Sequence, residues 1–441
     1  MSTCRVPPLL ALLLVPALLV ACGPRPTLPA AAQPFVLEEI PPTPTPAGRP
    51  LRVLAPYVDE EAARFRKVLD DFTASSGVQV QFTGAPEVPG ALLQALEADQ
   101  PPDVVVIPKP NWLGELAGAG VLAPLRAEVT AAVRGNYSAG WQELASHDGT
   151  LYGVPLNTTS KSLVWYRPAA VMAVGSSVPR TWDEWLALNR TLAAAGPTPL
   201  AVPGGEGWPL TDWFENVLLR TAGPETYDKL TRHEVPWTDP AVRTTFQEVG
   251  QMLRDEWLAG GRPGAAGAPL AETLAAAFDP EHPAATMVLG AGWVGPFVRA
   301  KHPGVILGRD LDFFSFPTIA RAFSGAVEGY ANTAVALNAR PETMALLAFL
   351  ASPEAAARWV RQGGVVSPNK SLALSAYPDD LTRREAAHLA DARIFVPDLS
   401  DTVPRAVSDA LAAGLQHFLR EPAALDTILT EIEAAAERTQ G

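Results

Sequence analysis

The stretch from Leu51 to Phe82, LRVLAPYVDEEAARFRKVLDDFTASSGVQVQF, decides the fold class. It opens with a short apolar run that is typical of a buried strand. Apolar residues then recur at helical spacing from Asp59 onward, and this run ends at Gly77, a residue type favoured just beyond helix C-termini. The alternating residues 78–82 are typical of a second strand. The stretch therefore predicts a strand–helix–strand unit.

The sequence downstream continues the same alternation. Residues 90–99 have helical spacing, residues 102–108 (PDVVVIP) form a continuous apolar run typical of buried parallel strands, and residues 112–125 return to helix. A capping box at residues 181–184, TWDE, predicts the start of a later helix. This order of elements predicts an α/β fold with a central, mainly parallel sheet and flanking helices.

The length and charge of the chain limit the number of domains and the kinds of function that it can have. The 441 residues are too many for one compact core, which indicates two or three domains or lobes. The net charge of −13, without a Lys/Arg cluster, argues against a nucleic-acid partner, because phosphate binding needs a basic face. The six histidines are scattered, and no serine-hydrolase elbow or phosphate-binding loop is found. We expect no metal, no cofactor and no catalytic residue.

The N-terminus resembles a lipoprotein leader. Residues 1–21 contain an apolar run of the length of a signal-peptide core, and it ends in LVAC, which resembles a bacterial lipobox. Cys22 would then carry lipid, and residues 22–50 would form a Pro-rich tether. Because Cys4 would leave with the leader, no thiol would remain for a disulfide. An ordinary secretory signal followed by a tail without a role is the alternative.

Polar side chains follow two predicted strands where those strands end. Tyr57 and Asp59 follow the first strand, and Lys109 and Asn111 follow residues 102–108. Ligands of open α/β sheets bind beyond the carboxyl ends of the strands, so we expect these four side chains near a ligand. Asp59 alternatively caps only the next helix.

The segment GWPLTDWFE, residues 207–215, places two indole rings beside carboxylates. Trp208 and Trp213 can form a platform for the weakly apolar face of a sugar ring, and Asp212 can accept hydroxyl hydrogen bonds. Alternatively the segment is a helix start, with Asp212 as the cap, Glu215 completing a capping-box variant and both rings packing into the core.

Lys161 enters a predicted strand in TTSKSLVWY. A lysine buried there without a partner is costly, so we expect it at a cleft edge, facing a ligand or a carboxylate. Thr158 and Thr159 precede it and can donate or accept hydroxyl hydrogen bonds. A surface position for Lys161 is the alternative.

Phrases from Leu51 to the C-terminus occur in the order found in one known family. They include PPDVVVIPKPNWLGELAGAGVLAPL, HDGTLYGVPLNTTSKSLVWYRP, VPRTWDEW, FPTIA and ALLAFLASPEAAARWVRQGGVVSPNKSL. Their order resembles that of the bacterial extracellular solute-binding proteins that serve ABC importers. KSLVWY, GWPLTDW, YDKL, GGVVSPNK and FVPDLSD most resemble the α-glucoside-binding branch of that family.

The resemblance implies a two-lobed periplasmic-binding-protein-like fold of type II, with a multi-crossing hinge and a sugar in the cleft. It implies three crossings, which we place near Pro155–Thr158, Phe316–Pro317 and Gly364–Ser367. Lobe one would then comprise residues 51–157 plus 317–363, and lobe two residues 158–316 plus 364–441.

The resemblance also implies three further site residues. Trp293 in MVLGAGWVGPF lies where relatives often offer a ring or polar group to the cleft, with core packing as the alternative. Glu328 and Tyr330 in GAVEGYAN depart from the small residues and Asp of relatives, so they are expected to fill part of the cleft and alter which sugar fits. The Cys pair that many relatives carry beside the Trp208 and Trp293 regions is missing here.

Together with the lipobox-like leader, the resemblance implies a monomeric substrate-binding protein, lipid-anchored to the cell membrane outside the cytoplasm, that delivers an oligosaccharide to ABC permease subunits. An α-glucoside such as trehalose, sucrose or maltose is the expected ligand. A receptor for another solute, such as a polyamine, is one alternative. An extracellular glycoside hydrolase is another, but Asp212 and Glu215, three positions apart on one helix, cannot flank a glycosidic bond.

Overall fold

The structure is a computed structural model that describes residues 48–108 and 110–439. The predicted signal peptide, Cys22, most of the predicted tether and Lys109 lie outside the described residues. The described residues form one compact unit.

The opening stretch folds as its pattern predicts. Strand β1 (Leu51–Ala55), helix α1 (Asp59–Ser76) and strand β2 (Val80–Gly84) follow one another, and β1 pairs with β2 in parallel. Helix α1 ends at Gly77, whose φ of 74° is the left-handed conformation that glycine adopts without a Cβ penalty. Its backbone N–H donates to the carbonyl of Thr73 and so satisfies one end of the helix.

The large sheet is mixed rather than mainly parallel. Its strand order is β11-β10-β3-β1-β2, with β6 also paired to β10. β1 pairs in parallel with β2 and β3, and β10 with β11, but β10 runs antiparallel to both β3 and β6. The second sheet, β8-β7-β9, is antiparallel throughout its described strands. The strands not yet delimited are β3 (Val104–Ile107), β4 (Ser146–His147), β5 (Thr150–Leu151), β6 (Gly153–Ser160), β7 (Leu163–Tyr166), β8 (Met287–Leu289), β9 (Asp312–Ser315), β10 (Ala326–Ala336) and β11 (Ile394–Pro397).

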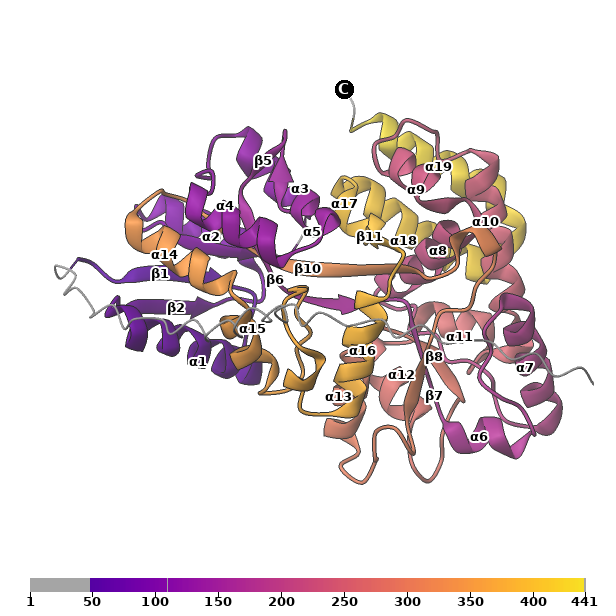
Figure 1. Cartoon of the computed structure of the whole chain (residues 1–441). Helices are drawn as coiled ribbons and strands as arrows, with labels where there is room; N and C mark the ends of the chain where they lie inside the picture. Colours follow the sequence, from indigo (N-terminus) through magenta and orange to yellow (C-terminus); the bar gives the residue numbers. More distant parts are fainter. Residues whose placement is uncertain (1–47, 109, 440–441) are drawn as a thin grey trace, which may run out of the picture. The chain divides into compact units, whose positions relative to one another are not determined.

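Figure 1 shows helices gathered in two lobes, with β6 and β10 running between them. The first lobe, built on β1, β2 and β3, includes α1, α2 (Val88–Glu97), α3 (Pro110–Gly118), α4 (Ala127–Asn136), α5 (Ala139–Leu144), α14 (Pro341–Leu350) and α15 (Pro353–Val360). The second lobe, built on β7, β8 and β9, includes α6 (Pro168–Ala173), α7 (Trp182–Ala195), α8 (Trp208–Thr221), α9 (Gly223–Thr231), α10 (Pro240–Met252), η1 (Asp255–Trp257), α11 (Gly261–Gly267), α12 (Leu270–Ala277), α13 (Val294–Lys301), η2 (Arg321–Phe323), α17 (Leu399–Thr402), α18 (Arg405–Arg420), η4 (Pro422–Ala424) and α19 (Leu425–Glu437). Between them lie η3 (Leu374–Ala376) and α16 (Asp380–Ala390).

The chain crosses between the two cores in β6, in β10 and after α15. Leu156 lies in the first-lobe core and Val164 in the second-lobe core, so the first crossing is at the end of β6. Phe316 and Ala326 both pack in the second-lobe core, whereas Ala334 packs in the first. The second crossing therefore lies within β10 and not at Phe316–Pro317, because the segment from Phe316 to Ala326 still packs on the second lobe.

The third crossing follows α15. Val365 packs in the first-lobe core and Leu381 in a second-lobe core, while Val366 forms an antiparallel bridge with Thr158 of β6. The predicted start of α7 is confirmed, since Thr181 and Glu184 form both hydrogen bonds of a capping box.

Candidate functional site

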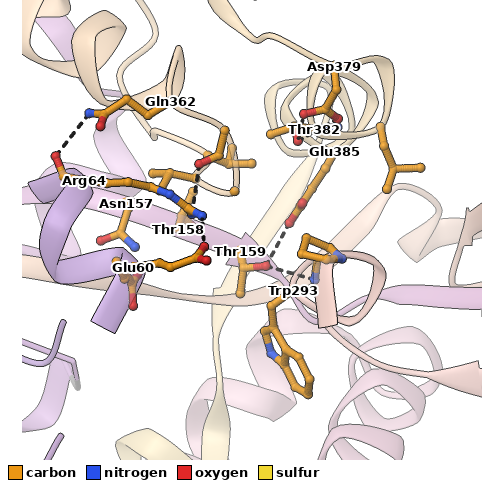
Figure 2. A pocket seen from close by; sticks show the side chains of 18 of the residues that line it. Glu60, Arg64, Asn157, Thr158, Thr159, Trp293, Gln362, Asp379, Thr382 and Glu385 are labelled. Carbon is orange, nitrogen blue, oxygen red and sulfur yellow. Dashed lines mark hydrogen bonds and ion pairs between the residues drawn. The ribbon is translucent and has the colours of Figure 1, made fainter. Parts of the chain in front are cut away.

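Two adjoining cavities lie where the lobes meet. The larger has a volume of about 520 Å³, and residues of α1, β6 and α16 line it (Figure 2). The smaller has a volume of about 340 Å³ and is lined by Tyr57, Lys161 and Trp208 among others. Because both cavities are lined by Glu61, Trp293 and Tyr330, they form two compartments of one cleft.

Aromatic rings from both lobes line the smaller cavity. Trp208 is the first residue of α8 and is half-buried, and the centroid of its ring lies 6.4 Å from that of the half-buried Trp293. Tyr57 is almost fully buried, and its hydroxyl donates a hydrogen bond to Oδ1 of Asn157 at 2.6 Å. The structure thus brings together four of the five predicted aromatic residues: Tyr57, Trp208, Trp293 and Tyr330.

Trp213 lies elsewhere. Its ring is 1% exposed and stacks on Trp185 in the second-lobe core, with ring centroids 5.3 Å apart, and it lines neither cavity. Helix α8 begins at Trp208, with Pro209 in its first turn, so Trp213 projects about 140° around the helix from Trp208. The predicted platform of two tryptophans is therefore wrong for Trp213, which packs in the core.

The same helix start moves Asp212 away from the capping position. Asp212 is 2% exposed and lies in the second turn of α8, where Oδ1 accepts from Nζ of Lys161 at 3.0 Å. Lys161 also pairs with Oδ2 of Asp398, and its ammonium lies 5.3 Å from the centroid of the Trp208 ring. Of the two partners predicted for Lys161, a ligand or a carboxylate, the structure shows carboxylates. The lysine also lines the smaller cavity.

The charges in this group depend on one another. Burial disfavours the ammonium, but attraction to Asp212 and Asp398 outweighs burial and holds the pKa of Lys161 well above its usual value. Burial raises the pKa of Asp212 to about 7 despite the lysine. Although burial opposes ionisation of Asp398 too, Lys161 and the hydroxyl of Ser400 hold its pKa below the usual value. Asp398 is therefore the ionised partner of the lysine.

Glu328 was expected to fill part of the cleft, but it lines neither cavity. It is fully buried in β10, where Oε2 accepts from Nδ2 of Asn216 at 2.6 Å and Oε1 has no hydrogen-bond partner among the described residues. Burial and the nearby carboxylates, Glu215 first among them, raise the pKa of Glu328 well above its usual value, which favours its neutral form. Glu328 therefore acts within the protein interior and does not contact the cleft.

Glu215 is also internal. Its two carboxylate oxygens accept hydrogen bonds from the backbone N–H groups of Leu399 and Ser400, at 2.6 and 3.1 Å. It therefore ties α8 to the start of α17 instead of capping its own helix.

Three buried carboxylates lie as close together as the ligands of a metal ion would. One oxygen each from Asp212, Glu328 and Asp398 lies within 4.8 Å of the others. The ammonium of Lys161 already bonds two of these three groups, so the arrangement is an internal ion pair with a neutral neighbour.

The larger cavity contains most of the remaining predicted residues. Asp59 is exposed at the start of α1 with a φ of 48°, and it lines this cavity. Thr158 donates its hydroxyl hydrogen to the carbonyl of Tyr330 at 2.7 Å, and Thr159 donates to Oε1 of Glu385 at 2.8 Å. Asn111 lies in the first turn of α3.

Several cavity residues were missed by sequence reasoning. Glu61 lines both cavities, and burial raises its pKa. Its neighbour Asp59, predicted from its place after the strand, lines only the larger of the two cavities, although both residues lie in the first turn of α1. Asp401, which lines the smaller cavity, and Asp398, which pairs with Lys161, lie in FVPDLSD, a phrase that carries only a resemblance. Glu385 lies on a polar helix without any distinguishing motif.

Residues 55–357 match the family model of bacterial extracellular solute-binding proteins. The chain belongs to this family. Its fold is the two-lobed type II fold expected from the sequence, and members of the family bind extracellular or periplasmic solutes. Searched along its described residues, this solute-binding protein contains no helix with the length and apolar character needed to cross a membrane.

Two relatives match most of this solute-binding protein. The osmoprotective compounds-binding protein GgtB of Synechocystis sp. is 32% identical over 80% of this chain and 85% of its own length. The alpha-glucosides-binding periplasmic protein AglE of Rhizobium meliloti is 30% identical over 84% of each chain. Among solved structures, the bacterial solute receptor AcbH, described as preferring β-D-galactopyranose, superposes with a TM-score of 0.75 at 22% identity, covering 88% of this chain and 98% of its own. That structural likeness supports the fold alone.

Proposed function

We propose that this solute-binding protein captures a neutral oligosaccharide, an α-glucoside such as trehalose, sucrose or maltose, and delivers it to the permease of an ABC importer. The observation that carries the proposal is the pair of cavities that meet at Glu61, Trp293 and Tyr330. A sugar ring offers a weakly apolar face and a rim of hydroxyl groups, and the cleft offers aromatic rings beside acceptors and donors of hydrogen bonds. The similarity to AglE supports an α-glucoside in particular.

The proposed ligand contacts divide between the two cavities. In the smaller cavity, Trp208 and Trp293 stack on a ring, while Tyr57 and Lys161 stand beside it. In the larger cavity, the contacts come from Asp59, Thr158, Thr159 and Tyr330. We retain Lys109 and Asn111 as candidates from their place after β3. Asp212 acts through Lys161, which it holds in place.

Closure of the lobes around the ligand is part of the proposal. Residues on α1 and on α16 face the same cavity from opposite sides (Figure 2), so a ligand that touches both favours the state in which they approach. A micromolar dissociation constant corresponds to a binding free energy of about 8 kcal/mol. A few kcal/mol of this are enough to shift the population from the open to the closed state. The crossings in β6, in β10 and after α15 are the proposed hinge.

We further propose that the protein is a monomer without catalytic activity, anchored outside the cytoplasm by lipid on Cys22. A glycosidase needs two carboxylates across the bond that it breaks. Asp212, the candidate named for such a role, is buried beneath Lys161 and pairs with it, which speaks against hydrolysis. A polyamine is the second candidate ligand, because carboxylates outnumber guanidinium groups in the larger cavity.

Calorimetric titration of residues 48–441 with α-glucosides, β-glucosides, monosaccharides and spermidine tests the proposal. We expect saturable binding of at least one α-glucoside and a loss of about tenfold or more in affinity for Trp208→Ala, since stacking and apolar burial are both lost. Trp141→Phe is the control variant, because Trp141 is also half-buried but lines neither cavity. Binding of spermidine without binding of any sugar would refute the proposed ligand class.

A further inference from the structure

A buried carboxylate, that of Glu385, stands in the wall of the larger cavity. It projects from α16 towards Thr159 of β6 (Figure 2), and the residue is 7% exposed. Its Oε1 accepts hydrogen bonds from Oγ1 of Thr159 at 2.8 Å and from the backbone N–H of Ser160 at 3.1 Å. Within the described part of the chain, no protein group donates a hydrogen bond to Oε2. One oxygen is therefore fixed by the protein, and the other is available to a ligand.

The backbone at Gly292 holds this carboxylate against the aromatic wall. The N–H of Gly292 donates to Oγ1 of Thr159 at 3.0 Å, so one threonine hydroxyl links the glycine to Glu385. A Cβ at position 292 would lie 2.1 Å from each oxygen of Glu385, which only glycine avoids. The next residue, Trp293, lines both cavities. The carboxylate and the indole ring are thus placed together by one short segment.

Glu385 has no cationic partner among the described residues. Burial raises its pKa to about 7, and two hydrogen bonds oppose that rise. The titratable groups that face it from the surrounding elements are acidic or neutral: Asp379 before α16, Tyr330 of β10 and Tyr377 after η3. A hydroxyl group of a bound ligand would supply the donor that Oε2 lacks.

The lining of the larger cavity is acidic as a whole. Two guanidinium groups line it, and one of them, that of Arg64, pairs with Glu60 at 2.8 Å. The other belongs to Arg299. The carboxylates that line it are those of Asp59, Glu60, Glu61, Asp379 and Glu385. An anionic ligand would therefore meet an excess of like charge.

We propose that Glu385 is a ligand-recognition residue whose Oε2 accepts a hydrogen bond from a ligand hydroxyl, and that the cleft selects an uncharged glycoside over its phosphorylated form. This inference rests on the proposed function and deepens it by naming what the cleft rejects. It also predicts a pH dependence of binding, because the charged carboxylate is the stronger acceptor. At pH 6 about one-tenth of Glu385 is ionised; with a neutral form that binds about tenfold more weakly, affinity falls about fivefold from its value at high pH.

Calorimetric titrations with trehalose, sucrose, maltose, trehalose 6-phosphate and sucrose 6-phosphate, at pH 6 and pH 8, test the inference. In Glu385→Gln the amide oxygen keeps the bonds from Thr159 and Ser160, while the amide nitrogen replaces Oε2. We expect about tenfold weaker binding of the neutral glycoside at pH 8, with the loss between pH 8 and pH 6 reduced to twofold or less. Glu225→Gln, at an exposed position on α9, is the matched control and keeps the wild-type profile.

The outcomes separate the two claims. Binding of the neutral glycoside by Glu385→Gln at wild-type affinity and with the wild-type pH profile overturns the role of Glu385. Equal binding of a glycoside and its phosphate ester overturns the charge selection. No neutral glycoside bound by the wild-type protein refutes the proposed function itself and this inference with it. If Glu385→Gln does not fold, the wild-type pH profile and the phosphate esters still decide between these results.

Discussion

Replacing Lys161 by methionine removes an ammonium group that contacts two buried carboxylates, those of Asp212 and Asp398. The side chains of Asp212 and Asp398 are 3% and 1% exposed, so water cannot take over the role of the lysine. Removing one partner of a buried pair costs about 3–5 kcal/mol, because the remaining charge stays uncompensated. We expect the lower end of that range near pH 7, since Asp212 is already half protonated there and Asp398 keeps hydrogen bonds from Ser400 and the N–H of Asp401.

The sign of the pH dependence separates this explanation from a packing defect. In the wild-type protein the pKa of Asp398 is depressed, so its contribution is present above the unfolded pKa and is lost as pH falls through the folded value. Without Lys161 its folded pKa rises above the unfolded value, and the variant loses stability as pH rises. The difference between wild type and Lys161→Met should therefore be larger at pH 8.5 than at pH 5.5.

Urea unfolding followed by tryptophan fluorescence and circular dichroism measures this difference. Lys229→Met is the control, because its partner Glu225 is 82% exposed and such surface pairs contribute about 0–1 kcal/mol. Adding Asp398→Asn to Lys161→Met should recover part of the loss, since no charge is then left unpaired. A loss below about 1 kcal/mol at pH 8.5, or a loss that does not change with pH, would refute the reasoning.

Three further predictions concern the pair Trp213 and Trp208, then Glu328, then Gly292. Trp213→Ala should lower the free energy of unfolding by about 3–5 kcal/mol, whereas Trp208→Ala should lower ligand affinity and cost less stability; paired urea melts and titrations check this. Glu328→Gln should change the free energy of unfolding at pH 8 by less than about 1 kcal/mol, because the buried acid is already neutral and Gln has the same shape; a loss above 3 kcal/mol would mean that the carboxylate is charged. Gly292→Ala should reduce glycoside affinity at least tenfold, since its Cβ displaces the carboxylate of Glu385, and a crystal structure of the variant would show whether that carboxylate has moved.

Local patterns were enough for much of the fold. The strand–helix–strand unit from Leu51 to Gly84, the glycine cap at Gly77 and the capping box of α7 depend on neighbouring residues, and all three are present. The resemblance supplied the two lobes. The direction of β10 was not predictable in this way, because an antiparallel strand between β3 and β6 is decided by where the chain returns from the second lobe.

The place of a site residue could be predicted only where neighbouring residues in the sequence determine it. Trp208 and Trp213 have similar neighbours in the sequence, but Trp208 lines the cleft and Trp213 packs in the core. They differ because α8 starts at Trp208 rather than near Asp212. Glu385 was missed because its partner Thr159 is 226 residues away in the chain. Lys161 could be predicted to need a carboxylate, but not which one, since Asp398 comes from a segment after the third crossing.

The buried ion pairs of Lys161 support one wall of the ligand cleft. Lys161 lies between Asp212 of α8 and Asp398 before α17, and its ammonium faces the ring of Trp208 at the start of α8. The ion pair therefore fixes the wall of the smaller cavity within the second lobe, whereas Tyr57 is fixed through Asn157 on the first-lobe side. A wall held by charges keeps its shape whether or not a ligand is bound, so the energy of binding can go into bringing the two walls together. On this reasoning Lys161→Met should weaken glycoside binding as well as folding, and restoring stability with a second substitution elsewhere should not restore affinity.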